Sequence, residues 1–82
     1  MTANQINILR SLGGNVRGAR ATLGISQEEL GYRVDLHRTY ISGIELGRRN
    51  PTLLVIAKLA RGLGISIEDL VRSCDDPRRS GK

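Results

Sequence analysis

Apolar residues recur every three or four positions through the first third of the sequence. Between positions 6 and 23 they are Ile6, Leu9, Leu12, Val16, Ala19 and Leu23. This spacing gives a helix one apolar side, so it predicts a first helix over residues 11–23. Gly24, suited to a left-handed C-cap, would end it. Residues 1–10 are predicted to form an N-terminal extension, either an extra turn of this helix or a separate short helix.

A second and a third helix are predicted in the middle of the chain. The segment Ser26–Glu29 has the form of a capping box. In that motif the serine side chain and the acidic side chain three residues later each accept a hydrogen bond from the other's backbone N–H. The second helix is therefore expected over residues 27–34 and ends at Asp35, which tolerates left-handed backbone angles. The third is expected over residues 37–46, followed by Gly47.

The last two predicted helices are short and apolar. The fourth, over residues 53–62 with Thr52 as its N-cap, has apolar side chains around much of its circumference. That pattern indicates burial on more than one side. The fifth is expected over residues 67–73, and the charged tail at 74–82 is expected to be disordered. The prediction is an all-α fold, a compact five-helix bundle with one helix-turn-helix domain over residues 11–73.

Composition and charge narrow the possible partners. The chain has 82 residues, enough for one domain, and neither Phe nor Trp, so its core must come from Leu, Ile, Val and Ala. Its formal net charge of +5 favours a polyanionic partner such as nucleic acid. No apolar run approaches the roughly 20 residues that a membrane span needs, and no signal-peptide pattern is visible. We therefore expect a cytoplasmic protein with no membrane partner.

Reactive side chains are scarce. Cys74 and His37 are the single examples of their types, so they provide neither an internal disulfide nor a zinc site. No set of acid, base and nucleophile is visible, and we expect no enzyme, cofactor, metal or small-molecule ligand. His37, at the start of the third helix, is interpreted as a capping or packing residue. Cys74 is interpreted as inert.

The two middle helices and their short connection have the form of a helix-turn-helix. In that unit the second helix enters the DNA major groove with its leading residues at the base edges. Ile41 and Ile44 would point inward, and the opposite side, which has no acidic residue, consists of Thr39, Ser42, Gly43 and Leu46. Arg38 and Thr39 occupy the leading turn. There an arginine can bind guanine O6 and N7, and a threonine can contact a base or a thymine methyl.

Phosphate contacts are expected on both sides of the third helix. The free backbone N–H groups where the second helix starts, at Ser26 and Gln27, form an anion site. Arg48, Arg49 and Asn50 follow the third helix. Basic and polar residues there would bind the DNA backbone beyond the groove without reading its sequence.

These residues resemble a known family. The segment 15–70, with the motifs SQEEL, YIS.IE.G.R.P and LA..LG, is similar to the Cro/phage-repressor type of helix-turn-helix domain, also called the Xre family. The short length and the segment HRTYISGIELGRRNPTL are most similar to controller proteins of restriction–modification systems, which are dimeric regulators that time endonuclease expression. Gly31, Asp35 and Leu46 depart from residues common in the family, and Leu46 puts a phosphate contact at its position in doubt.

The resemblance implies roles for individual residues. Arg38, Thr39 and Tyr40 fall where family members read bases. The positions where members contact the DNA backbone or groove edge are Ser26, Gln27, Ser42, Gly43, Arg48, Arg49, Asn50 and Thr52. Arg20 and Glu45 match a pair that forms a structural salt bridge between the first helix and the end of the third.

Specific binding is expected to require a homodimer on a palindromic operator, because one helix-turn-helix reads few base pairs. The interface is predicted at three apolar residues near the C-terminus, Ile65, Ile67 and Leu70. We therefore expect a transcriptional regulator of restriction–modification controller type that binds double-stranded DNA at its own promoter, with RNA polymerase as a further candidate partner. A prophage repressor or Cro-like regulator, and an antitoxin, are alternative interpretations.

Overall fold

The chain folds into helices, as its hydrophobic pattern predicts. The computed structural model describes residues 1–75 and contains α1 (Ala3–Leu23), α2 (Gln27–Val34), α3 (Arg38–Glu45), α4 (Leu53–Leu63) and α5 (Ile67–Leu70). Within these residues there is no strand, and the predicted all-α bundle of five helices is confirmed. The predicted disorder of the tail concerns mainly residues 76–82, which lie outside the described residues.

α1 is longer than predicted and continuous. It begins at Ala3, so the first ten residues are almost entirely part of the first helix and not a separate extension. Thr2 caps it through a reciprocal pair of bonds with Gln5. Thr2 Oγ1 accepts from the Gln5 N–H at 3.2 Å, and Gln5 Oε1 accepts from the Thr2 N–H at 2.9 Å. This capping box stabilises the first turn of the helix, ahead of the apolar spacing that starts at Ile6.

Two glycines allow helices to approach closely. A Cβ on Gly13 would collide with the backbone carbonyl oxygens of Ile44 and Glu45, so its absence lets α1 lie directly against the end of α3. A Cβ on Gly31 would collide with the carbonyl oxygen of Leu36, in the turn between α2 and α3. Both glycines lower intrinsic helix propensity, and packing outweighs that cost.

Side-chain caps fix the starts of the shorter helices. Ser26 and Ser66 each accept a bond from the backbone N–H three residues later, at 3.0 Å. Asp35 ends α2 in the left-handed region with φ 57°, as predicted. The predicted capping box at Ser26 is only half formed, because the Glu29 carboxylate pairs instead with Arg33 at 3.2 Å.

α5 is shorter than predicted. It ends at Leu70, and the chain then turns until Ser73, which has a left-handed φ of 64°. Asn15 on α1 explains the early end. Its Nδ2 donates to the backbone carbonyls of Leu70 and Arg72, at 2.9 and 2.7 Å. These bonds satisfy two carbonyl groups that would otherwise need N–H donors from a further turn of helix.

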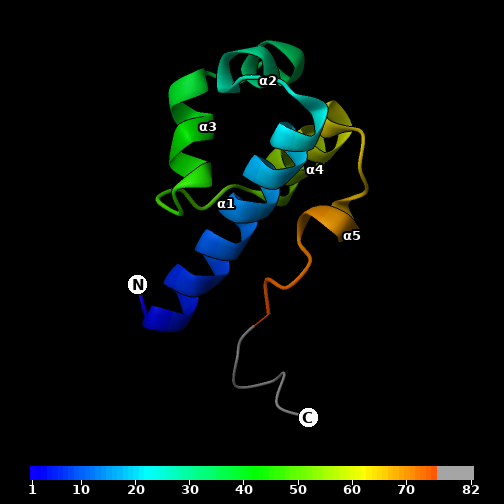
Figure 1. Ribbon diagram of the computed structural model, residues 1–82. Coiled ribbons are helices and arrows are strands. Elements are labelled where there is room, and N and C mark those ends of the chain that lie inside the picture. The colour runs from blue at the N-terminus through cyan, green and yellow to red at the C-terminus, as the bar shows by residue number, and fades with distance from the viewer. Residues whose placement is uncertain (76–82) are drawn as a thin grey trace.

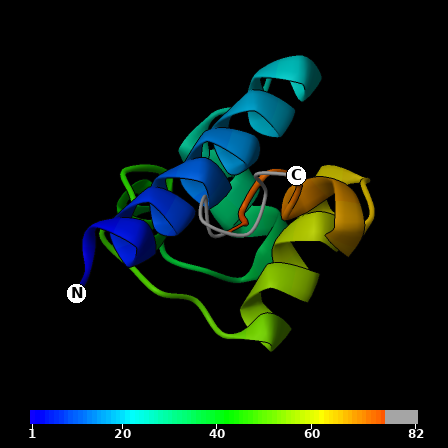
Figure 2. The same cartoon turned by 90° about the horizontal axis from the view of Figure 1, so that it is seen from below.

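The core lies where α1 crosses the other helices. α1 runs diagonally through the bundle, with α3 on one side and α4 and α5 on the other (Figures 1 and 2). The buried apolar side chains that meet there are Leu12, Val16, Leu30, Val34, Ile41, Ile44, Leu59, Ala60, Leu63 and Leu70. Because α3 contributes two of them from one side, its opposite side faces outward.

Candidate DNA interface

α3 is anchored by one side and exposes the other. Ile41 and Ile44 are fully buried, as the helical spacing predicts. Arg38 and Thr39 are exposed at the leading end of the helix. Together with α2 and the tight turn at Asp35, α3 forms the two-helix unit whose second helix fits a major groove.

His37 fixes the start of α3. Its Nδ1 accepts a hydrogen bond from the Thr39 N–H at 3.0 Å, so the imidazole is the N-cap of the helix. This confirms the capping interpretation of His37. Arg38, the next residue, takes part in neither of the two ion pairs found within residues 1–75. Its guanidinium is therefore available to a base edge or a phosphate.

Tyr40 is placed differently from the two residues before it. It is half-buried and packs against the core cluster. The guanidinium of Arg49 lies over its ring, 5.4 Å from the centroid, in a cation–π contact. Gly43 provides the space, because a Cβ there would lie 2.8 Å from Arg49 Cγ. Arg49 therefore folds back along α3, a contact that the sequence did not indicate.

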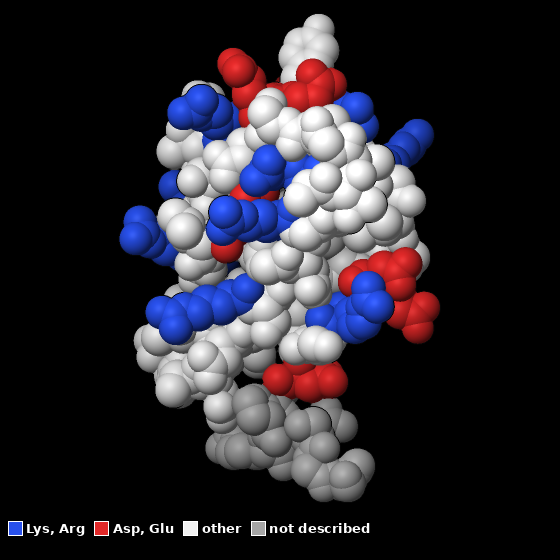
Figure 3. Space-filling view, in the orientation of Figure 1, with Lys and Arg blue, Asp and Glu red and all other residues white. Residues whose placement is uncertain are grey.

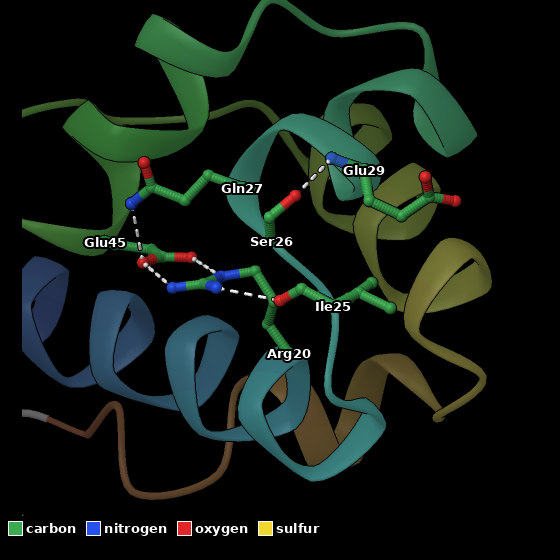
Figure 4. Close-up of polar contacts among 6 residues, drawn as sticks. All are labelled: Arg20, Ile25, Ser26, Gln27, Glu29 and Glu45. Carbon is green, nitrogen blue, oxygen red and sulfur yellow. Dashed lines mark hydrogen bonds and ion pairs between the residues drawn. The ribbon is translucent and has the colours of Figure 1, made fainter.

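A partly buried ion pair joins α1 to the end of α3 (Figure 4). Nε and Nη2 of Arg20 donate to the two carboxylate oxygens of Glu45 at 2.8 and 3.1 Å, and Nη1 donates to the Ile25 carbonyl at 2.9 Å. The side chains of Arg20 and Glu45 are only 17% and 4% exposed. The hydrogen bond with Glu45 raises the pKa of Arg20 and outweighs the opposing effect of burial. The structural pair implied by the resemblance is present.

Gln27 belongs to the same network, which the sequence did not indicate. Its Nε2 donates to Glu45 Oε1 at 3.0 Å, so the first residue of α2 is tied to the last residue of α3 (Figure 4). The side-chain nitrogen of Gln27 carries two hydrogens. Glu45 accepts one of them, and the second can be donated to another group. Ser26 and Thr52 likewise accept backbone bonds as N-caps. Their hydroxyl hydrogens are still free to be donated.

Charge is unevenly distributed over the surface. In Figure 3 the basic side chains gather on the side of α3, and the acidic ones lie mainly near α2 and α5. Glu45, the one acidic residue of α3, is covered by its ion pair. Around α3, Ser42 and Gly43 are half-exposed, and the exposed residues between α3 and α4 are Leu46, Arg48, Arg49, Asn50 and Thr52.

The three predicted dimer residues differ in their surroundings. Leu70 is fully buried, so the prediction that it meets a second copy is wrong. It belongs to the core cluster, where α5 packs against α1 and α4. Ile65 is half-buried, and Ile67 is 40% exposed. The most exposed apolar side chains of α4 are instead Leu53 and Leu54, at 67% and 78%.

The described residues show little other chemistry. Within positions 1–75 no group of metal-binding side chains is clustered, and no helix has the length and apolar character to span a bilayer. Burial, together with the charge of Asp75, raises the pKa of the Cys74 thiol. Because the thiolate is the reactive form, this shift supports the interpretation of Cys74 as inert.

Known proteins share this domain. The helix-turn-helix family model HTH_3 matches residues 16–70. Control protein C.BamHI from Bacillus amyloliquefaciens is 46% identical over 66 residues, which cover 79% of this chain and 82% of that protein. The uncharacterized HTH-type transcriptional regulator y4dJ from Sinorhizobium fredii is 35% identical over 71 residues, 87% of this chain and 92% of that protein. The crystal structure of the restriction–modification controller protein C.AhdI from Aeromonas hydrophila matches with a TM-score of 0.74 and 40% identity, over 76% of this chain and 94% of that one.

The matched region contains the whole candidate site. Residues 16–70 include the ion pair, both helices of the helix-turn-helix, the loop after α3 and the two C-terminal helices. The solved relative agrees with the fold. The chain therefore belongs to the HTH_3 helix-turn-helix family and is a DNA-binding transcriptional regulator, not an enzyme, related to the controller proteins of restriction–modification systems.

Proposed function

We propose that this regulator reads a specific DNA sequence with the leading turn of α3. Arg38 would bind guanine O6 and N7, and Thr39 would contact a base or a thymine methyl. Tyr40, stacked under Arg49, would contact the groove from the flank. The observation that carries this proposal is the exposed start of α3, a helix with no acidic residue over positions 38–44, on a fold shared with control proteins.

The DNA backbone would be held on both sides of α3. On the α2 side, Ser26 would offer its hydroxyl and Gln27 its second amide hydrogen to a phosphate. On the other side, the proposed contacts are Arg48, Arg49, Asn50 and Thr52. Ser42 and Gly43, which are small and half-exposed on α3, would let the helix approach the groove edge closely. These contacts position the domain and carry no sequence information of their own.

We further propose that two copies bind a palindromic operator as a homodimer. The exposed apolar residues Leu53, Leu54 and Ile67 are the proposed contacts, and half-buried Ile65 remains a further one, whereas buried Leu70 does not. Burying one leucine side chain stabilises an interface by about 1.5–3 kcal/mol. A two-fold dimer would present the two copies of α3 to half-sites one helical turn apart, or multiples of it.

The relatives support a role as the controller of a restriction–modification system. C.BamHI and C.AhdI are similar to this chain over most of its length. In that role the protein would bind upstream of its own gene and regulate its own promoter. Its DNA-bound form would change the access or recruitment of RNA polymerase there.

Footprinting of the region upstream of its own gene, over a range of salt concentrations, tests this function. We expect two symmetric protected half-sites, and an affinity that falls linearly with salt on logarithmic axes. Equal affinity for the upstream region and for random DNA would refute the proposal of specific reading. Protection of a specific site elsewhere, with the upstream region bare, would refute self-regulation alone.

A further inference from the structure

Arg10 lies beside the end of α3 although it precedes the region that the family model covers, which begins at residue 16. A Cβ on Gly47 would lie 2.8 Å from Arg10 Cγ and 3.2 Å from its Cα and N, so backbone and side chain of Arg10 pack on this glycine. Gly47 has a left-handed φ of 73° and directly precedes Arg48. The extended start of α1 thus brings one more arginine to the basic loop after α3.

The guanidinium of Arg10 has no acidic partner in the described structure. Arg10 is exposed, and the two ion pairs within residues 1–75 are those of Arg20 with Glu45 and of Arg33 with Glu29. In Figure 3 separate basic side chains, with uncharged surface between them, lie on the side of α3 and below it. Because Arg10 packs on Gly47, it adds a basic side chain from α1 to those of the loop after α3.

We propose that Arg10 binds a DNA phosphate and so extends the backbone contacts of the α3 loop onto α1. The inference rests on the proposed DNA contact of α3, because Arg10 is placed relative to that helix. A guanidinium can donate two parallel hydrogen bonds to one phosphate. Since the DNA backbone continues past the edge of the groove, an arginine next to Arg48 meets a further phosphate of the same strand. This phosphate contact does not depend on the base sequence of the DNA.

The test measures salt-dependent binding of Arg10→Ala and Arg10→Lys to the operator and to a random duplex of equal length. Arg61→Ala is the matched control. It removes the same charge from an exposed position in the last turn of α4, in a groove with Arg33 and Lys58. We expect Arg10→Ala to weaken binding to both duplexes about 3- to 10-fold at ~0.1 M salt and to reduce the salt slope by about 0.9, the value for one phosphate.

The controls distinguish the loss of a phosphate contact at Arg10 from the loss of one positive charge anywhere on the domain. Arg10→Lys should retain most of the affinity, and Arg61→Ala should change it less than about twofold with the salt slope unaltered. Thermal unfolding followed by circular dichroism should be the same for all variants, because Arg10 and Arg61 are both exposed.

Two results would overturn the inference. One is an Arg10→Ala variant that behaves like Arg61→Ala, and the other is a loss confined to the operator, which would make Arg10 a base-reading residue. A wild-type protein without preference for any sequence would instead refute the proposed function. In that case the random duplex still tests the phosphate contact of Arg10.

Discussion

At the start of α3 the exposed side chains are polar, whereas α4 and α5 expose, among their charged side chains, three large apolar ones, Leu53, Leu54 and Ile67. His37 caps α3, and Arg49 is stacked on Tyr40. Leu54, in contrast, is 78% exposed in a small domain whose other leucines largely form its core. One surface is arranged within the single chain for a polyanion. The other surface exposes apolar side chains to water, which costs free energy. Contact with a second copy would bury them and remove that cost.

The largest expected effect is on the apolar surface. Leu54→Asp should abolish the dimer, because each of two symmetric leucines contributes about 1.5–3 kcal/mol when buried, so about 3–6 kcal/mol is lost. Sedimentation at micromolar concentration should change from dimer to monomer. Operator affinity should fall with it, because the second half-site no longer adds to binding.

Leu23→Asp is the matched control for this variant. Leu23 is also exposed, at 45%, and ends α1. We expect Leu23→Asp to remain dimeric. If Leu54→Asp also sediments as a dimer, or the wild type is a monomer, then the apolar surface of α4 has another use and the contrast between the two surfaces needs a different explanation.

A smaller effect is expected from the ion pair that supports the polar surface. Glu45→Ala leaves Arg20 without its carboxylate in a partly buried position and removes the partner of Gln27. Breaking a buried pair costs about 3–5 kcal/mol, and because Arg20 keeps some solvent contact we expect about 3 kcal/mol. Urea unfolding measures the change. Glu29→Ala, which breaks the exposed pair with Arg33, should cost less than about 1 kcal/mol.

The pH dependence of this pair follows from the pKa of Arg20. In the fold that pKa is raised from the ordinary arginine value, mainly by the hydrogen bond with Glu45. A raised pKa stabilises the fold fully below the ordinary value, and the contribution is lost only as the pH rises through the folded value. The difference in stability between wild type and Glu45→Ala should therefore show no loss from arginine titration near neutral pH. A steep decline between pH 7 and 9 would contradict this.

The two surfaces differ in how well the sequence predicted them. The orientation of α3 depends on local spacing, because Ile41 and Ile44 on one side leave Arg38 and Thr39 on the other. The starts of α2, α4 and α5 were also predictable, since their cap residues bond to neighbours three positions away. Such features need no knowledge of how distant segments meet.

Other features depend on contacts between distant residues. Leu70 is buried and not shared with a second copy because α5 packs on α1, where Asn15, 55 residues earlier, binds its carbonyl. The bond between Gln27 and Glu45 likewise requires two helix ends to meet. Gly43 indicated in the sequence that another group can approach α3 closely. The sequence could not show that this group is the side chain of Arg49.

On the polar surface, Arg38→Ala separates base reading from simple charge. We expect a loss of about 1–3 kcal/mol on the operator and little change on random DNA, because a bidentate contact to guanine discriminates between sequences. Competition binding with single-base operator variants measures it. Relaxed preference at one base position would identify the base, and equal weakening on all DNA would show that Arg38 contacts a phosphate.

The smallest expected effect comes from the loop after α3. Arg48→Ala should weaken operator and random DNA alike by about 1 kcal/mol and reduce the salt slope by about 0.9, because one phosphate contact is lost. Arg49→Ala should do the same and also remove the contact with Tyr40, so its loss on the operator should exceed its loss on random DNA. The difference between these two arginines, measured over a salt series, shows how far the stacked pair contributes to specificity. Identical losses on both duplexes for both variants would mean that Arg49 acts only as a charge and that its position along α3 is incidental.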